Sequence, residues 1–168
     1  LAGEDFAVLL FVLPGLEEGT GQVTIRNFVL SEEEAMYNPI NSGFTNIKTI
    51  YISSSVTSIG ESAFYGCSNI ESMTVLFIGA AVEEVYSYYY PLGYFFGTTQ
   101  YDNSQKTTQY PYYKSSQGNN YTQSTYKYYY IPLKLKSVTV TGDFLSPGAF
   151  YNCELIENIT INGNISII

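Results

Sequence analysis

The chain alternates short apolar runs with polar stretches, and one six-residue pattern occurs four times. It reads apolar, charged, polar, apolar, any residue, apolar, and it occupies residues 47–52, 70–75, 135–140 and 156–161. The last four positions alternate and are rich in β-branched residues, which predicts a short strand with one buried face. Apolar residues such as Ile50 and Ile52 are therefore expected to point inward.

A second pattern predicts a turn that follows some of these strands. Residues 59–67 recur as 145–153, with Ala, Phe, Tyr and Cys at matching positions. The strand pattern that begins at Ile47 begins again at Ile70, and the one at Leu135 begins again at Ile156. A spacing in the low twenties is the length of a leucine-rich repeat, in which coils stack about 4.8 Å apart and pair their strands in parallel. We therefore expect a mainly β solenoid.

The inward strand positions and the small or apolar turn positions make up the predicted core of the repeat. They are Ile50, Ile52, Ala63, Phe64, Cys67, Val138, Val140, Ala149, Phe150, Cys153, Ile159 and Ile161. The two cysteines are expected two coil spacings apart, roughly 10 Å, which exceeds the Cα separation of about 7 Å that a disulfide allows. Two buried free thiols are predicted.

The repeat is interrupted at about residues 76–133, which hold 14 of the 18 tyrosines. Aromatic runs at 88–90 and 128–130 flank a polar centre, which predicts an inserted β-hairpin or small sheet. The polar middle, from about Thr98 to Thr125, is expected to be mobile. The repeat domain is thus assigned to residues 44–168, with this insertion.

Residues 1–43 do not follow the repeat. Residues 6–13 and 22–30 read as strands, and Ser31 begins a sequence typical of a helix cap. This part is expected to be either an N-terminal β cap for the solenoid or the tail of a preceding β-sandwich domain. Because the chain begins with Leu1 and not Met, we expect it to be a piece of a longer protein with further repeats or domains.

Composition and charge exclude several classes of function. The net charge is −8, from 7 basic and 15 acidic residues, which argues against nucleic acid and anionic lipid as partners. No segment approaches the roughly 18 apolar residues that span a membrane. The chain has no His, so Ser-His-Asp and Cys-His catalysis are impossible. Its paired carboxylates read as solvated faces, and no metal or cofactor motif is present; we expect no enzyme activity, metal or cofactor.

The tyrosines are the candidate ligand contacts, because Tyr combines a rigid apolar face with a polar tip. Those assigned are Tyr88, Tyr90, Tyr101, Tyr110, Tyr113, Tyr128 and Tyr130. The alternative is that most tyrosines of the segment pack it against the solenoid. A row of exposed, coplanar rings flanked by Asn, Gln or Asp would favour a glycan, and a broad aromatic patch would favour a protein.

Residues 56–60 and 63–70, with the turn at 149–153, resemble the BspA-type leucine-rich repeat. Residues 92–97, 131–132 and 136–139 are similar to a recurrent insertion in such proteins from gut-associated bacteria. Residues 1–42 resemble the closing strands of a cohesin-like β-sandwich. The repeat resemblance covers about residues 44–168. It implies a secreted or cell-surface location and adhesion to an extracellular protein, and it implies no catalytic residues. A glycan-binding module and a structural spacer are the alternatives.

Overall fold

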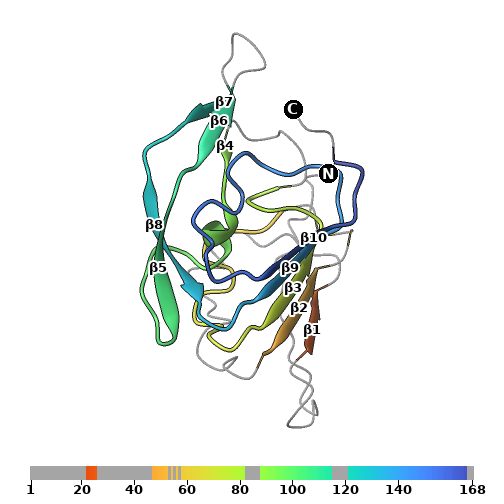
Figure 1. Ribbon diagram of the computed structural model, residues 1–168, viewed down its shortest axis with the longest axis vertical. Helices are drawn as coiled ribbons and strands as arrows, with labels where there is room; N and C mark the ends of the chain where they lie inside the picture. The colour runs from red at the N-terminus through yellow and green to blue at the C-terminus, as the bar shows by residue number, and fades with distance from the viewer. Residues whose placement is uncertain are drawn as a thin grey trace, which may run out of the picture.

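Short parallel strands build the main sheet of the protein. The computed structural model describes residues 22–25, 47–52, 54, 56, 58–81, 88–114 and 121–165. Five strands form one sheet in the order β1-β2-β3-β9-β10, and all its pairs are parallel. Their bounds are β1 Gln22–Ile25, β2 Thr49–Ile52, β3 Ser72–Val75, β9 Ser137–Val140 and β10 Asn158–Ile161. The predictions of a mainly β chain and a parallel ladder are confirmed (Figure 1).

The register of this sheet places equivalent positions of the six-residue pattern side by side. Ile50 is paired with Met73, and Met73 with Val138, so that inward positions form a continuous apolar row. Each of these side chains is at most 1% exposed. The outward positions are polar or half-exposed, and Tyr51 is 44% exposed. The alternation in each short strand therefore gives the sheet one buried face and one face toward solvent.

Two turns, at residues 61–66 and 147–152, and a 3-10 helix between them stack against the inner face of the sheet and close the core. The turn at 61–66 donates the Phe64 N–H to the carbonyl of Phe95 at 2.8 Å, and Phe95 ends the 3-10 helix η2 (Leu92–Phe95). Leu92 at the start of η2 donates its N–H to the carbonyl of Ala149 in the turn at 147–152, also at 2.8 Å. Helix η2 thus occupies the position between the two Ala-Phe turns.

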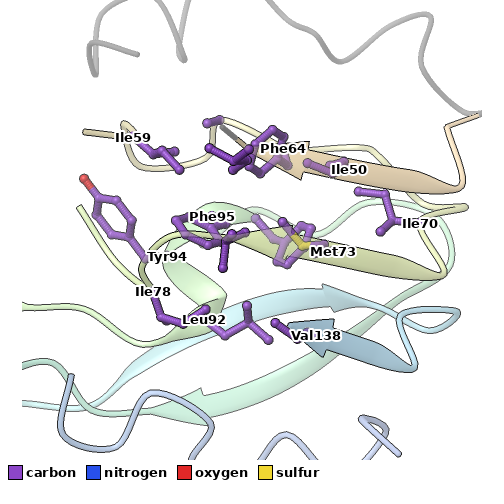
Figure 2. Close-up of a cluster of buried hydrophobic side chains, with 14 of the residues drawn as sticks. Ile50, Ile59, Phe64, Ile70, Met73, Ile78, Leu92, Tyr94, Phe95 and Val138 are labelled. Carbon is purple, nitrogen blue, oxygen red and sulfur yellow. The ribbon is translucent and has the colours of Figure 1, made fainter. Parts of the chain in front are cut away.

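Aromatic packing joins these tiers. The rings of Phe64 and Phe95 meet edge to face, with centroids 5.9 Å apart, and Phe96 lies near Phe64 with a centroid distance of 6.5 Å. Figure 2 shows Phe64 in one tier beside Ile50, and Phe95 in the next beside Met73. The predicted insertion at about residues 76–133 therefore supplies part of the core, because residues 92–96 are all buried.

Two residues of the predicted core, both in the last strand of the sheet, are exposed. Ile159 and Ile161 take the inward positions of β10, yet they are 46% and 44% exposed. The register is as predicted, since Ile159 is paired with Val138 and Ile161 with Val140. Among the described strands, β10 has a neighbour on one side, so no further coil covers its apolar side chains. Inward orientation alone does not bury a residue at the end of a stack.

A matched pair of substitutions measures this difference. Ile50→Ala is expected to lower the free energy of unfolding by about 2 to 5 kcal/mol, because it removes a fully buried side chain and leaves a cavity. Ile159→Ala, at the same position of the repeat, is expected to cost under about 1 kcal/mol. Urea unfolding of both variants checks the prediction. Equal losses would show that β10 is covered in solution.

The tyrosine-rich segment forms two small antiparallel sheets. Strands β5 (Ser104–Gln109) and β8 (Lys127–Pro132) pair along their whole length, and β6 (Tyr112–Lys114) lies between β4 (Tyr88–Tyr89) and β7 (Tyr121–Gln123). In Figure 1 the β5–β8 pair lies on the opposite side of the molecule from the parallel sheet, with η2 between them. The polar middle, which was expected to be mobile, contains β5, β6 and β7.

Polar residues of this segment take part in the buried face of a strand pair. Thr107 and Gln109 are 6% and 0% exposed, and they share the inner face of the β5–β8 pair with Tyr129 and Ile131. The polar composition of β5 predicts no buried face, whereas alternate residues of the strand face the core.

Alternating charges run along the start of the four described repeat strands. Lys48, Glu71, Lys136 and Glu157 occupy the same position of the six-residue pattern. The Lys48 and Glu71 side chains lie 3.4 Å apart, as do those of Lys136 and Glu157. Glu71 and Lys136 belong to neighbouring strands, whose backbones are linked by the Lys136 N–H to the Glu71 carbonyl. We call this row the charge ladder.

Of the N-terminal segment, the structure describes β1 at Gln22–Ile25, within the strand expected over residues 22–30. It extends the parallel ladder as the neighbour of β2. The strand expected at 6–13 and the helix cap at Ser31 lie outside the described residues. The cohesin-like resemblance of residues 1–42 also falls almost entirely on them.

Candidate functional site

The outer face of the β5–β8 pair carries the most prominent group of exposed aromatic side chains among the described residues. Tyr128 on β8 is 42% exposed, and Tyr126, just before the strand, is 48% exposed. Tyr129 between Tyr128 and Tyr130 points inward and is completely buried. Successive residues of a strand face opposite ways, so one run of three tyrosines serves both the core and the surface.

Four tyrosines form a connected group here, which we call the tyrosine face: Tyr110, Tyr126, Tyr128 and Tyr151. The ring of Tyr110 lies 5.4 Å from that of Tyr151 and 6.3 Å from that of Tyr126, and Tyr126 lies 5.3 Å from Tyr128. The interplanar angles are 71°, 77° and 62°, so each contact is edge to face. Tilted rings of this kind expose aromatic edges, faces and hydroxyl groups but form no common plane.

Two polar contacts lie beside the tyrosine face. The ammonium group of Lys106 lies 3.7 Å from the ring centroid of Tyr128, a cation–π contact. Asn152, next to Tyr151, donates a 2.9 Å hydrogen bond from its side-chain amide to the carbonyl of Thr108. This bond attaches the turn at 147–152 to β5, which explains how Tyr151 reaches the rings of the antiparallel pair.

Of the other candidate tyrosines, Tyr90 and Tyr101 lie away from this surface. Tyr90 is half-buried and stacks on the buried ring of Tyr94 at 4.4 Å. Tyr101 packs against Tyr65 at 5.3 Å, and burial raises the pKa of its hydroxyl well above the usual range, as do the nearby Cys67 and Tyr65. Tyr90 and Tyr101 therefore pack against the core. Tyr130 is half-buried and lies two positions after Tyr128 on β8, so its side chain is on the same face of the strand as that of Tyr128.

Tyr113 is 36% exposed on β6, and Tyr88 is its partner on β4. The side chain of Tyr88 is outside the described part of the chain. Sequence reasoning missed Tyr126 and Tyr151, two of the most exposed rings. The placement of Tyr126 two positions before Tyr128 was a signal for the first. For Tyr151 there was no such signal, because it belongs to the repeated turn, and its neighbour Tyr110 lies in a distant part of the sequence.

A buried glutamine holds the two parts of the structure together behind the tyrosine face. The side-chain oxygen of Gln109 accepts a 2.8 Å hydrogen bond from the N–H of Gly93 in η2. Its amide nitrogen donates to the carbonyl of Tyr151 at 2.7 Å and lies 3.2 Å from the sulfur of Cys153. A β-carbon on Gly93 would come within 2.5 Å of the Gln109 oxygen, so glycine is needed for this approach.

Both cysteines are free thiols. Cys67 is fully buried, and burial raises the pKa of its thiol to about 12. Burial also raises the pKa of the partly buried Cys153 to about 12, while the hydrogen bond from Gln109 acts in the opposite direction. The thiols are therefore packing groups and not nucleophiles at neutral pH.

Other predicted core positions differ in burial. Phe150 is partly buried against the core, whereas Ala63, Ala149 and Val140 are buried.

The described part of the chain contains no group of three or more His, Cys, Asp or Glu side chains that could hold a metal ion. Nor is any helix in that part long and apolar enough to cross a membrane. The tyrosine face thus stands as the candidate functional site on its own geometry.

A ladder of short parallel strands with stacked turns is the architecture of a repeat protein. Residues 27–90 and 104–168 match the BspA type Leucine rich repeat region, in six copies. The chain belongs to the family of BspA-type leucine-rich-repeat proteins. The match omits residues 91–103 and includes residues 104–133, which were predicted to belong to the insertion. It also includes residues 27–43, which were predicted to lie outside the repeat. Neither the curated proteins nor the solved structures contain a significant match to the chain.

This result confirms the resemblance that the repeated strand and turn predicted. The repeat is of a non-enzymatic scaffold type, and membership of the family is consistent with a surface protein-binding scaffold.

Proposed function

We propose that the chain is part of a secreted or cell-surface adhesion scaffold that binds a protein of a host or neighbouring cell through the tyrosine face. In this proposal β2, β3, β9 and β10 belong to a longer solenoid that comprises residues 44–168 and further repeats. Residues 1–43 serve as its cap or as the end of a preceding domain. The tyrosine-rich segment is an insertion that presents the binding surface.

The observation that carries the proposal is the exposure of the tyrosine face. Tyr126, Tyr128 and Tyr151 are 42–48% exposed although they contact one another or Tyr110. Tyr is among the residues enriched in protein interfaces, because its ring buries a large area at low entropic cost. A spacer would have its tyrosines fully packed, which is not the arrangement of these three.

The ring geometry favours a protein over a glycan. A sugar ring stacks on a flat aromatic surface, and rows of coplanar rings suit successive sugars. The rings of the tyrosine face are inclined by 62° to 77° to their neighbours. A protein surface, with side chains of varied shape, is better matched to such an uneven aromatic surface.

Surface plasmon resonance on purified extracellular-matrix proteins tests the proposal. The intact chain is expected to bind at least one of them, and Tyr126→Ser with Tyr128→Ser is expected to weaken that binding at least tenfold, since buried interface tyrosines often contribute about 2 kcal/mol each. Tyr51→Ser is the matched control, because Tyr51 is equally exposed on the parallel sheet.

The result would contradict the proposal if both variants bound like the intact chain. A glycan array run beside it separates the alternatives: binding there that needs Tyr126 and Tyr128, with none to proteins, would establish a glycan-binding module. Point substitutions are preferable to replacing residues 98–125, because that replacement would delete β5 and the buried Gln109.

A further inference from the structure

One pair of the tyrosine face has the geometry of a reactive site. The rings of Tyr126 and Tyr128 are 5.3 Å apart, centroid to centroid. The two rings are in edge-to-face contact, inclined by 62° to each other. A side-chain hydrogen bond with Tyr128 is the main cause that raises the pKa of the Tyr126 hydroxyl.

Exposure of both rings distinguishes this pair from other close tyrosine pairs, since Tyr65, Tyr101 and Tyr110 are half-buried in theirs. Tyr126 and Tyr128 are 48% and 42% exposed, so an oxidising enzyme can reach both. In the pairs Tyr89–Tyr121 and Tyr90–Tyr94 one ring is nearly fully buried. Tyr129, next to Tyr128 in the sequence, is completely buried and protected.

We propose that Tyr126 and Tyr128 form a site of oxidative cross-linking, at which a peroxidase with hydrogen peroxide joins the two rings by a carbon–carbon bond. Each phenol loses one electron and its hydroxyl proton, which gives two phenoxyl radicals. The radicals combine at the carbons next to oxygen, and the hydrogen atoms on those carbons return to the oxygens as the rings become aromatic again. Two hydrogen atoms leave the protein, and hydrogen peroxide is reduced to two molecules of water.

The arrangement favours coupling within one chain over coupling between chains. A radical on either ring has its partner 5.3 Å away, whereas a second molecule must diffuse to it. Tyr110 and Tyr151 extend the ring chain at 6.3 and 5.4 Å. The product would hold the two exposed rings in a fixed relation to each other. This inference rests on the pair geometry and not on the proposed binding role.

The site is tested by oxidising the folded chain at low concentration with peroxidase and hydrogen peroxide, followed by trypsin and mass spectrometry. Trypsin cleaves after Lys127, which lies between the two tyrosines. A cross-link therefore keeps peptides 115–127 and 128–134 together, with two hydrogen atoms missing, and fragment ions locate the bond. We expect this joined peptide as the main product of the monomer.

Two variants test whether the cross-link depends on the geometry of the Tyr126–Tyr128 pair. Tyr128→Phe keeps the ring but has no hydroxyl, and is expected to lose the joined peptide entirely. Tyr51→Phe removes an equally exposed tyrosine outside the face and is expected to keep it. In urea the cross-links should spread over many tyrosine pairs. An unchanged monomer mass, coupling at other pairs only, or equal selectivity in urea would overturn the proposal.

Discussion

Gln109→Ala is expected to lower the free energy of unfolding by about 3 kcal/mol or more. The substitution leaves the buried N–H of Gly93 and the part-buried carbonyl of Tyr151 without their partner, and it removes a side chain that is 0% exposed. An orphaned buried polar group costs about 1 to 3 kcal/mol, and the lost packing and the lost part-buried hydrogen bond add to this cost. Since a domain is stable by only about 5 to 15 kcal/mol, much of its stability would be lost.

Urea denaturation followed by circular dichroism measures the effect. Gln109→Met is the informative companion, because it restores most of the volume but neither hydrogen bond, and it is expected to be nearly as destabilised as Gln109→Ala. Gln123→Ala, on an exposed position of β7, should change stability by less than about 0.5 kcal/mol. A fully stable Gln109→Met would show that the side chain acts by filling space.

The second large effect is a loss of stability at alkaline pH. The pKa of the Cys67 thiol is raised from 9.0 to about 12 by burial, so the folded state keeps a proton that the unfolded state releases above pH 9. The folded state then binds more protons than the unfolded state, and stability falls as pH rises. Between pH 9 and 11 this thiol alone accounts for a loss of about 2 to 3 kcal/mol.

Other buried groups act in the same direction. Burial raises the pKa of Cys153 to about 12, and burial, with nearby Glu61, Tyr90 and Tyr94, raises the pKa of Tyr129 further from its usual value. Unfolding free energies measured from pH 7 to 11 should therefore decline steadily above pH 9. In Cys67→Ala, the decline between pH 8 and 10 should be shallower when each profile is referred to its own value at pH 7. Parallel profiles would contradict the assignment to Cys67.

The sequence predicted the repeat because its signal is local and recurrent. Ile50, Val138 and their neighbours alternate within short strands, and the same six positions return at a nearly constant spacing, so the face of each strand could be assigned without knowing its neighbours. The BspA-type resemblance followed from the same positions and is confirmed. Exposure of Ile159 could not be assigned in this way, because it depends on what lies beyond β10 and not on β10 itself.

The tyrosine-rich segment was less predictable for the opposite reason. Gln109 stands in a polar stretch, and its partners Gly93 and Tyr151 are 16 and 42 residues away, so nothing near it in the sequence indicates burial. Helix η2 has no Ala-Phe motif, although it takes the place of a turn between two that have it. Composition indicated that tyrosines matter here, but only the three-dimensional contacts separate Tyr128 on the surface from Tyr101 in the interior.

The charge ladder has a consequence for how such an array can grow. Each charged side chain of the ladder is exposed and contributes little to stability by itself. Its charge is opposite in sign to that of the side chain at the same position in each neighbouring coil. Duplication of a single coil would bring two lysines or two glutamates side by side, where like charges repel. Duplication of two adjacent coils would preserve the alternation. A gene of this kind is thus expected to lengthen or shorten most readily by the duplication or deletion of two adjacent coils.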